Sequence, residues 1–342
     1  MTARQPPPRR IVVSRTDRIG DVVLSLPVAG ALRRAYPGAE LCFLGRRYVR
    51  DVIDACEHVD RFVAWPDEAP SRREAAAIVR AIGADAIVHV FPRERIAWGA
   101  WRAGVARRIG TSRRWYHWFA CNERVRLSRK RSALHEAELN LRMAAPLLAG
   151  REWSIAESHG LYGLTRAAPL PARWSAVIDA RRFNLVVSPL TGGTDPAWPL
   201  DQWRAFIDAL DGERFRVFVA GSAAEGATLR PWLDALPRHA TDITGQTLAE
   251  LMAFIRASDG FVAASTGPLH IAAALGARAL GLYPASSTGV PARWRPIGAR
   301  AELLTAPEGE PAAGGVRHAV AGIAVRDVLR VVERWAASAA ER

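Results

Sequence analysis

The sequence is poor in lysine and cysteine and has no long apolar run. Lys130 is its single lysine, so arginine supplies nearly all of the formal charge of +13. The three cysteines, Cys42, Cys56 and Cys121, are odd in number and lack metal-ligand spacing, which favours reduced thiols over a disulfide framework. No apolar run is long enough to cross a bilayer, and MTARQPPPRR leads into IVV without the apolar core of a signal peptide. We therefore expect a cytoplasmic protein.

Several motifs of nucleotide enzymes are also missing. There is no GxGxxG in the first strand–helix turn, no GxxxxGK[ST], no GxSxG elbow and no zinc-ligand spacing. These absences disfavour a dehydrogenase and a P-loop kinase, and we expect no bound metal.

The chain is long, and strand-like runs alternate with helical patterns along it. The chain has 342 residues, 49% of them hydrophobic, which favours two domains over one core. Strand-like runs alternate with helical patterns in both halves, which predicts parallel sheets with crossover helices. The predicted strands are IVVSR, ELCFLG, RFVAWP, DAIVHVFP, FNLVVSPL, FRVFVAG, GFVAAS and RALGLYP. The predicted helices cover 21–36, 47–56, 71–82, 132–148, 248–258, 268–276 and 325–340, and one more begins at Pro199.

The fold class is therefore α/β, with two Rossmann-like domains facing each other across a cleft. A stretch over 150–173 loses periodicity and is the expected linker. Ligands of open α/β sheets bind at the carboxyl ends of the strands, so the loops after strands are the informative ones.

The first such loop is SRTDRIGDVVLSLP, where Gly20 permits a tight turn and Asp21 starts a helix. Asp21 either complements the helix dipole or acts as a general base aimed into the cleft. A helix N-terminus lowers the pKa of a carboxylate, so a weak base is expected here.

Two loops in the second half of the chain are placed where they could bind a nucleotide. Thr191, Gly192 and Gly193 in SPLTGGTDPAWP can cradle a phosphate or simply turn. Glu225 in VAGSAAEGA can bind ribose hydroxyls or cap a helix.

The stretch ASTGPLHIAAALG follows a strand and opens a helix. The amides at Thr266 and Gly267 then form an anion site at the helix N-terminus. His270, one turn in, either adds charge there or simply packs.

A basic and aromatic segment spans 93–131, with twelve arginines or lysines against two glutamates. Trp98, Trp101, Trp115, Tyr116 and Trp118 lie among them. Such a segment suits nucleic acid, an anionic membrane surface or a phosphorylated substrate, or is a solvated face.

Taken together, these motifs resemble glycosyltransferase family 9, the bacterial heptosyltransferases. The resemblance rests on RIGDVVLSLPVAGALRRAYPGAELCFL, AWP, ITGQTLAELMAFI and STGPLHIAAALGARALGLYP, in that order. It implies a GT-B fold with an acceptor domain over 1–165, a nucleotide-sugar domain over 166–323, and a helix over 324–342 that packs back on the N-terminal domain.

The resemblance also implies an inverting, metal-independent transfer without a cofactor. The donor is then a nucleotide sugar, usually ADP-heptose, and the acceptor a phosphorylated glycolipid of the lipopolysaccharide core. Peripheral contact with the anionic inner membrane follows from such an acceptor and from the basic segment.

Carried over by position, Asp21 matches the base and Thr191 a contact to the donor phosphates. Glu225 matches the ribose-binding acid and Gln246 the adenine site. The diphosphate loop is matched by Ser265, Thr266, Gly267, Leu269 and His270.

Two positions depart from the family pattern. Pro196 stands where a lysine often contacts the donor phosphate, and Ser265 stands where aspartate is frequent. Arg18, beside Asp21, is a candidate for the missing cation.

Three rival functions remain open. A non-catalytic nucleotide-sugar-binding protein would explain the missing lysine, and a nucleotide-sugar epimerase could share the architecture. Nucleic-acid binding would explain the basic segment, but no recognised motif supports it, so we expect no nucleic-acid partner.

Overall fold

The computed structural model describes residues 6–129, 132–191, 197–308 and 320–340. The chain divides into two compact units, Met1–Arg166 and Ala167–Arg342, which are described separately. This division lies next to the boundary predicted after residue 165. Among the described residues, no helix is both long and apolar enough to cross a membrane.

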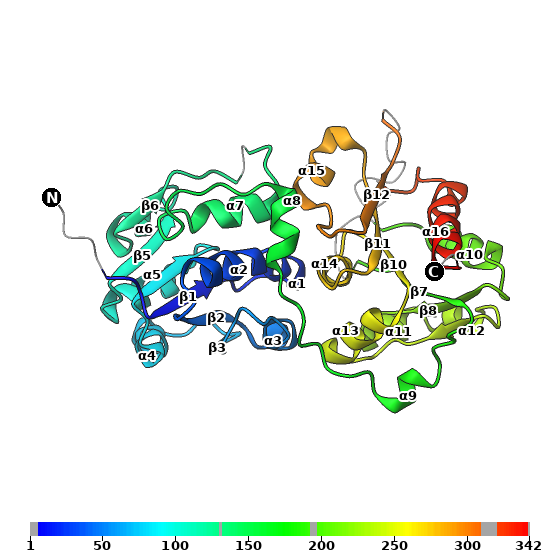
Figure 1. The fold of residues 1–342 in the computed structure, drawn as a ribbon, viewed down its shortest axis with the longest axis horizontal. Helices are drawn as coiled ribbons and strands as arrows, with labels where there is room; N and C mark the ends of the chain where they lie inside the picture. Colours follow the sequence, from blue (N-terminus) through cyan, green and yellow to red (C-terminus); the bar gives the residue numbers. More distant parts are fainter. Residues whose placement is uncertain (1–5, 130–131, 192–196, 309–319, 341–342) are drawn as a thin grey trace. The chain divides into compact units, whose positions relative to one another are not determined.

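The first unit is built on a parallel sheet of six strands in the order β3-β2-β1-β4-β5-β6 (Figure 1). This is the doubly wound order, in which the direction of strand succession reverses between β1 and β4. The strands are β1 (Arg10–Ser14), β2 (Glu40–Arg46), β3 (Arg61–Trp65), β4 (Ala86–His89), β5 (Arg107–Thr111) and β6 (Glu123–Val125).

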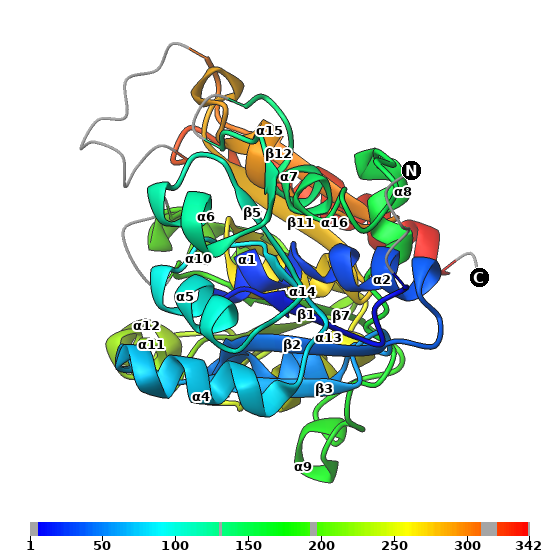
Figure 2. The ribbon, with the colours of Figure 1, turned by 90° about the vertical axis from the view of Figure 1, so that its left-hand side faces the viewer.

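Helices cover both faces of this sheet. The helices α4 (Arg72–Ile82) and α5 (Glu94–Arg102) bury their apolar sides against one face. The helices α2 (Leu26–Ala35) and α7 (Glu136–Met143) lie on the other side of the sheet from α4 (Figures 1 and 2). The remaining helices are α1 (Ile19–Val23), η1 (Arg47–Val49), α3 (Arg50–Asp54), α6 (Trp115–Ala120), α8 (Ile155–Ser158) and η2 (His159–Leu161).

Helix α4 shows how local sequence sets its ends. The Ser71 hydroxyl accepts the Glu74 amide N–H at 3.2 Å, and the Glu74 carboxylate accepts the Ser71 amide N–H at 2.8 Å. This capping box satisfies two amides of the first turn. Gly83 then ends the helix in the left-handed region, at φ +68°. The helix predicted over 71–82 is therefore confirmed.

Two other predicted helices are shorter than expected. The segment 21–36 is broken into α1 and α2 around Ser25, and Pro27 in the first turn of α2 has no amide to continue α1. The segment 132–148 contains only α7, which ends at Met143, and Pro146 shortly beyond it cannot extend the helix.

The second unit repeats the strand order of the first. Its six parallel strands run β12-β11-β10-β7-β8-β9, so succession reverses between β7 and β10. The strands are β7 (Phe183–Ser188), β8 (Phe215–Val219), β9 (Ala240–Asp242), β10 (Gly260–Ala264), β11 (Arg278–Tyr283) and β12 (Ala301–Thr305). The helices are α9 (Ala172–Ser175), α10 (Leu200–Ala209), α11 (Ala223–Thr228), α12 (Arg230–Asp234), α13 (Leu248–Ala257), α14 (Gly267–Ala274), η3 (Ser286–Thr288), α15 (Val290–Trp294) and α16 (Val325–Ala340).

The last helix, α16, belongs to the core of the second unit. Val332 and Trp335 are buried there with Trp203, and the Trp335 indole N–H donates to a Glu302 carboxylate oxygen at 2.7 Å. We expected this helix to pack on the N-terminal domain. That packing stays a prediction, whereas the apolar face of α16 is buried in the core of the second unit.

Candidate functional site

The candidate base of the first unit lies directly after β1. Asp21 is in the first turn of α1, and its side chain is partly buried. Arg15, the first residue after β1, is only 2% exposed, and its Nη2 lies 2.5 Å from Asp21 Oδ1. A buried guanidinium therefore fixes one oxygen of the carboxylate.

Helix α7 holds the other side of this arginine. Arg15 Nη1 donates to Glu136 Oε1 and to Asn140 Oδ1, both at 3.0 Å, and Arg15 Nε lies 3.4 Å from Asp17 Oδ2. Glu136 and Asn140 are one helical turn apart, so they share a face of α7. The planar guanidinium is thereby held by several acceptors at once. The single ammonium group of a lysine could not make the same set of bonds.

Two further arginines complete this group. Arg129 donates from Nε to Glu136 Oε1 at 2.9 Å and from Nη2 to Asn140 Oδ1 and Val90 O, each at 2.8 Å. Arg93 lies with its Nη2 3.3 Å from Asp17 Oδ1. We call this set the Arg15 cluster: Arg15, Asp17, Asp21, Arg93, Arg129, Glu136 and Asn140. Arg15, Asp17 and Asp21 follow β1 and Arg93 follows β4, at the point where strand succession reverses and ligands of such sheets bind. The other three members, Arg129, Glu136 and Asn140, follow β6 and reach the same group.

Burial raises the pKa of Asp21 above its ordinary value of 3.8, although Arg15 opposes the rise. The neighbouring carboxylates of Asp17 and Glu136 add to it. The lowered pKa expected for a helix N-terminus is therefore wrong, because desolvation is the largest effect at this position. A carboxylate with a raised pKa is the stronger base once ionised.

In the second unit the loop after β10 is built differently. Thr266 is the N-cap of α14, and its hydroxyl accepts the Leu269 amide N–H at 3.4 Å. Pro268 has no N–H to offer. Within the described chain the amides of Thr266 and Gly267 have no acceptor. The expected anion site is thus reduced to two backbone donors.

The other residues of this loop are largely enclosed. Leu269 is in the core, and His270 is 4% exposed on α14. Thr191 follows β7, the strand that pairs with β10, so it lies at the same reversal of strand order. Gly192, Gly193 and Pro196 lie outside the described residues.

These features agree with what the chain resembles. A family model described as glycosyltransferase family 9 (heptosyltransferase) matches residues 95–316, more than half of the chain. The chain belongs to glycosyltransferase family 9.

Three relatives show the range of similarity to this glycosyltransferase. A Haemophilus influenzae protein provisionally named as a glycosyltransferase is 24% identical over 301 residues, 84% of this chain and 86% of its own. A solved family 9 structure from Veillonella parvula has a TM-score of 0.80 at 17% identity, covering 98% of this chain and all of the other. The ADP-heptose lipopolysaccharide heptosyltransferase II of Escherichia coli has a TM-score of 0.74 at 19% identity, covering 96% and 99%. The fold of the glycosyltransferase is accordingly GT-B, with two Rossmann-like domains.

Two predicted donor residues of this family 9 chain differ in their local contacts. The Glu225 carboxylate accepts the Ser222 amide N–H at 2.7 Å, so it closes a capping box at the start of α11. Both polar atoms of the Gln246 amide are buried without a partner among the described residues. Their roles toward ribose and adenine stay predictions.

Sequence reasoning missed most of the Arg15 cluster. It named Arg18, which is exposed at the N-cap of α1, as a candidate for the missing cation, and that role stays a prediction. It did not foresee that Arg15 contacts Asp21. One signal was available: Glu136 and Asn140 are four residues apart in a helical pattern, which puts two polar side chains on one face.

Proposed function

We propose that this glycosyltransferase moves a heptose or related sugar from an ADP-sugar to a phosphorylated glycolipid of the lipopolysaccharide-core type. The transfer inverts the anomeric centre and uses no metal ion. The observation that carries the proposal is Asp21, a carboxylate of raised pKa fixed by a buried arginine. Similarity to an ADP-heptose lipopolysaccharide heptosyltransferase supports the donor and acceptor classes.

In this proposal the first unit supplies the base. The acceptor hydroxyl oxygen attacks the anomeric carbon while the bond from that carbon to the diphosphate oxygen breaks. The hydroxyl proton passes to Asp21, and the electron pair of the broken bond leaves with the diphosphate. Arg15 occupies Oδ1, which leaves Oδ2 to take the proton. Attack opposite the leaving group inverts the configuration.

The second unit binds the donor in this proposal. Negative charge grows on the diphosphate as it leaves, and backbone N–H groups at a helix N-terminus stabilise it. The amides of Thr266 and Gly267 are such groups, and the hydroxyl of Thr191 follows the neighbouring strand. The amide of Gln246 has hydrogen-bonding capacity left for an adenine.

The test is a screen of ADP-, GDP- and UDP-sugars by thermal shift, followed by product analysis. A ligand at a hundred times its Kd stabilises a fold by about 2.7 kcal/mol, which raises the Tm of a unit of this size by about 5–10 °C. We expect ADP-heptose to give this shift. Stabilisation by UDP- or GDP-sugars alone would overturn the donor assignment.

Product analysis tests the reaction itself. With extracted core glycolipid as acceptor, NMR of the product should show the anomeric configuration opposite to that of the donor, and EDTA should leave the rate unchanged. Retention of configuration, or loss of activity with EDTA that added Mg²⁺ restores, would contradict the mechanism. Donor binding without any transfer would favour a binding protein instead.

A further inference from the structure

The short helix α6 turns an entirely aromatic face outward. Trp115, Trp118 and Phe119 are 63%, 57% and 68% exposed, and they are the largest exposures among the bulky apolar side chains described. Their spacing at i, i+3 and i+4 puts them on one face of the helix. We call these three residues the aromatic surface. Side chains of this size are rarely left in water without a partner.

The opposite face of α6 fixes this surface in place. Tyr116 and Ala120 pack in a small core with Ala97 of α5, and His117 is fully buried. A methyl group built on Gly110 of β5 would come within 2.5 Å of His117 Nδ1, so helix and strand are in close contact. The aromatic surface therefore stands on a rigid base.

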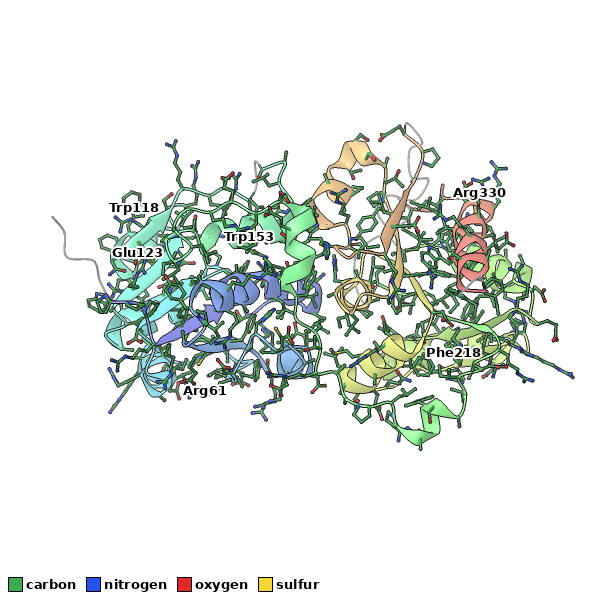
Figure 3. The ribbon with its side chains drawn as sticks, in the orientation of Figure 1. Arg61, Trp118, Glu123, Trp153, Phe218 and Arg330 are labelled. Carbon is green, nitrogen blue, oxygen red and sulfur yellow. The ribbon has the colours of Figure 1, made fainter. Side chains whose placement is uncertain are left out.

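One exposed ring is also held in its orientation. The Trp118 indole N–H donates to Ser112 O at 3.0 Å, and the guanidinium carbon of Arg124 lies 4.8 Å from the centre of the Trp118 ring. Figure 3 shows Trp118 at the outer edge of the first unit. An indole with its N–H satisfied and its ring outward is ordered before it meets any partner, which reduces the entropy cost of binding.

Exposed arginines flank the aromatic surface in the sequence. Arg113 and Arg114 precede it and Arg126 follows it, and all three are exposed. In the described part of the chain these three side chains form no ion pair, unlike Arg107, which is bound to Glu123. Exposed aromatic rings with arginines nearby in the sequence that form no ion pair among the described residues complement a surface that is apolar inside and anionic outside.

The strand that leads into α6 is two positions away in the sheet from the strand that leads to the candidate base. Strand β5 ends at Thr111, directly before α6, and strand β1 ends at Ser14, directly before Arg15. Both ends are carboxyl ends of parallel strands, so they lie at one edge of the sheet. Only β4 separates β1 from β5, which corresponds to roughly 10 Å.

We propose that the aromatic surface docks this protein on an anionic phospholipid bilayer, with the rings in the headgroup region and Arg113, Arg114 and Arg126 against the lipid phosphates. Tryptophan and arginine are the residues that favour this interface, and charge attraction adds to apolar burial there. Docking goes beyond the proposed sugar transfer. Its test needs neither donor nor acceptor, so either can fail alone.

The first experiment tests the charge. Full-length protein is floated with vesicles of phosphatidylglycerol and phosphatidylcholine, and with vesicles of phosphatidylcholine alone. We expect binding to the anionic vesicles only, and Arg113→Glu with Arg114→Glu should weaken it on the order of thirtyfold or more. The matched control reverses two exposed arginines of the second unit, Arg238 and Arg326, and should bind nearly as wild type.

The second experiment tests the rings. Trp115→Ser, Trp118→Ser and Phe119→Ser together should lower vesicle partitioning at least tenfold, whereas Trp115→Phe, Trp118→Phe and Phe119→Trp together should restore it. Near-UV circular dichroism and the Tm check that both variants fold. If the serine variant does not fold, quenching of wild-type tryptophan fluorescence by brominated lipid gives the same answer.

Three results would overturn the proposal. They are unchanged vesicle binding by the folded serine variant, equal binding of the wild type to neutral vesicles, and no quenching by brominated lipid. A lipid-free dimer that the serine substitutions abolish would also overturn it, because the surface would then be an interface between copies of this chain.

Discussion

The two units share one strand order, yet they present different chemistry where that order reverses. Around Arg15, directly after β1, the first unit gathers three arginines and three carboxylates from the segments after β1, β4 and β6, with Arg15 almost completely buried among them. After β7 and β10 the second unit places small polar side chains and two backbone amides, with no charged side chain in Ser265–Leu269.

This difference teaches what each unit is suited to do. A base needs surroundings that set its pKa, and only nearby charges and burial provide them. A diphosphate site needs donors that point at the ligand without carrying carboxylates of their own. The same backbone frame serves either purpose, so function here depends on the side chains placed on it.

The largest effect is expected from removing the proposed base. Asp21→Ala should lower kcat by about 10²–10⁴, because it removes the group proposed to take the acceptor proton. The Tm shift caused by the donor should be unchanged, because the proposal places donor binding in the second unit. Initial rates and thermal shift measure the two quantities. Near-normal transfer by Asp21→Ala would show that Asp21 is not the base. The charged group of the first unit would then have no catalytic role to set against the backbone donors of the second.

The next largest effect is expected from removing one backbone hydrogen-bond donor of the second unit. Gly267→Pro deletes the amide N–H, and the extended backbone of Thr266, at ψ 161°, tolerates a following proline. We expect kcat to fall by about 10²–10³, as for loss of one donor to a developing anion. Gly267→Ala keeps the N–H and is the control. Equal rates for the two variants would show that this amide does not contact the diphosphate.

A smaller effect concerns the pH profile. Arg15 lowers the pKa of Asp21, so Arg15→Lys, which cannot hold Asp21, Glu136 and Asn140 together, should raise that pKa further. The base is then protonated at higher pH, and the acid limb of kcat/KM moves upward. Arg93→Lys is the control, because Arg93 contacts Asp17 rather than Asp21. An acid limb that stays in place in Arg15→Lys would show that Arg15 does not tune the base.

The smallest effect is on stability. The folded pKa of Asp21 lies above its unfolded value, so its contribution is fully present below the unfolded pKa and is lost as pH rises through the folded pKa. Ionised Asp21 is therefore a net cost at pH 7. Asp21→Asn should raise Tm by a few degrees at most, with the difference shrinking toward pH 4. A lower Tm at pH 7 would mean that its bond to Arg15 outweighs desolvation.

Much of the fold follows from local pattern. Apolar runs such as ELCFLG and GFVAAS predict β2 and β10, and the helical pattern over 71–82 predicts α4. Strands β5 and β6 were not predicted, because RRIGT and ERV are short and rich in arginine. Their pairing comes from neighbouring strands rather than from their own apolar content.

Only part of the candidate site could be predicted from the sequence. Asp21 was found from the loop in which it lies. Its partner Arg15 was missed because the contacts that bury this arginine reach Glu136, 121 residues along the chain. No local spacing encodes such a contact. The raised pKa of Asp21 was missed for the same reason, since desolvation depends on packing.

The packing of α16 has a consequence for the order of folding. Residues 1–166 contain all six strands of the first sheet, so this unit can fold while the rest of the chain is still being made. The second unit cannot, because Val332 and Trp335 fill its core from the far end of the chain. Its core stays open until residues 325–340 have left the ribosome, so during translation the nascent second unit is the part most exposed to chaperones and proteases.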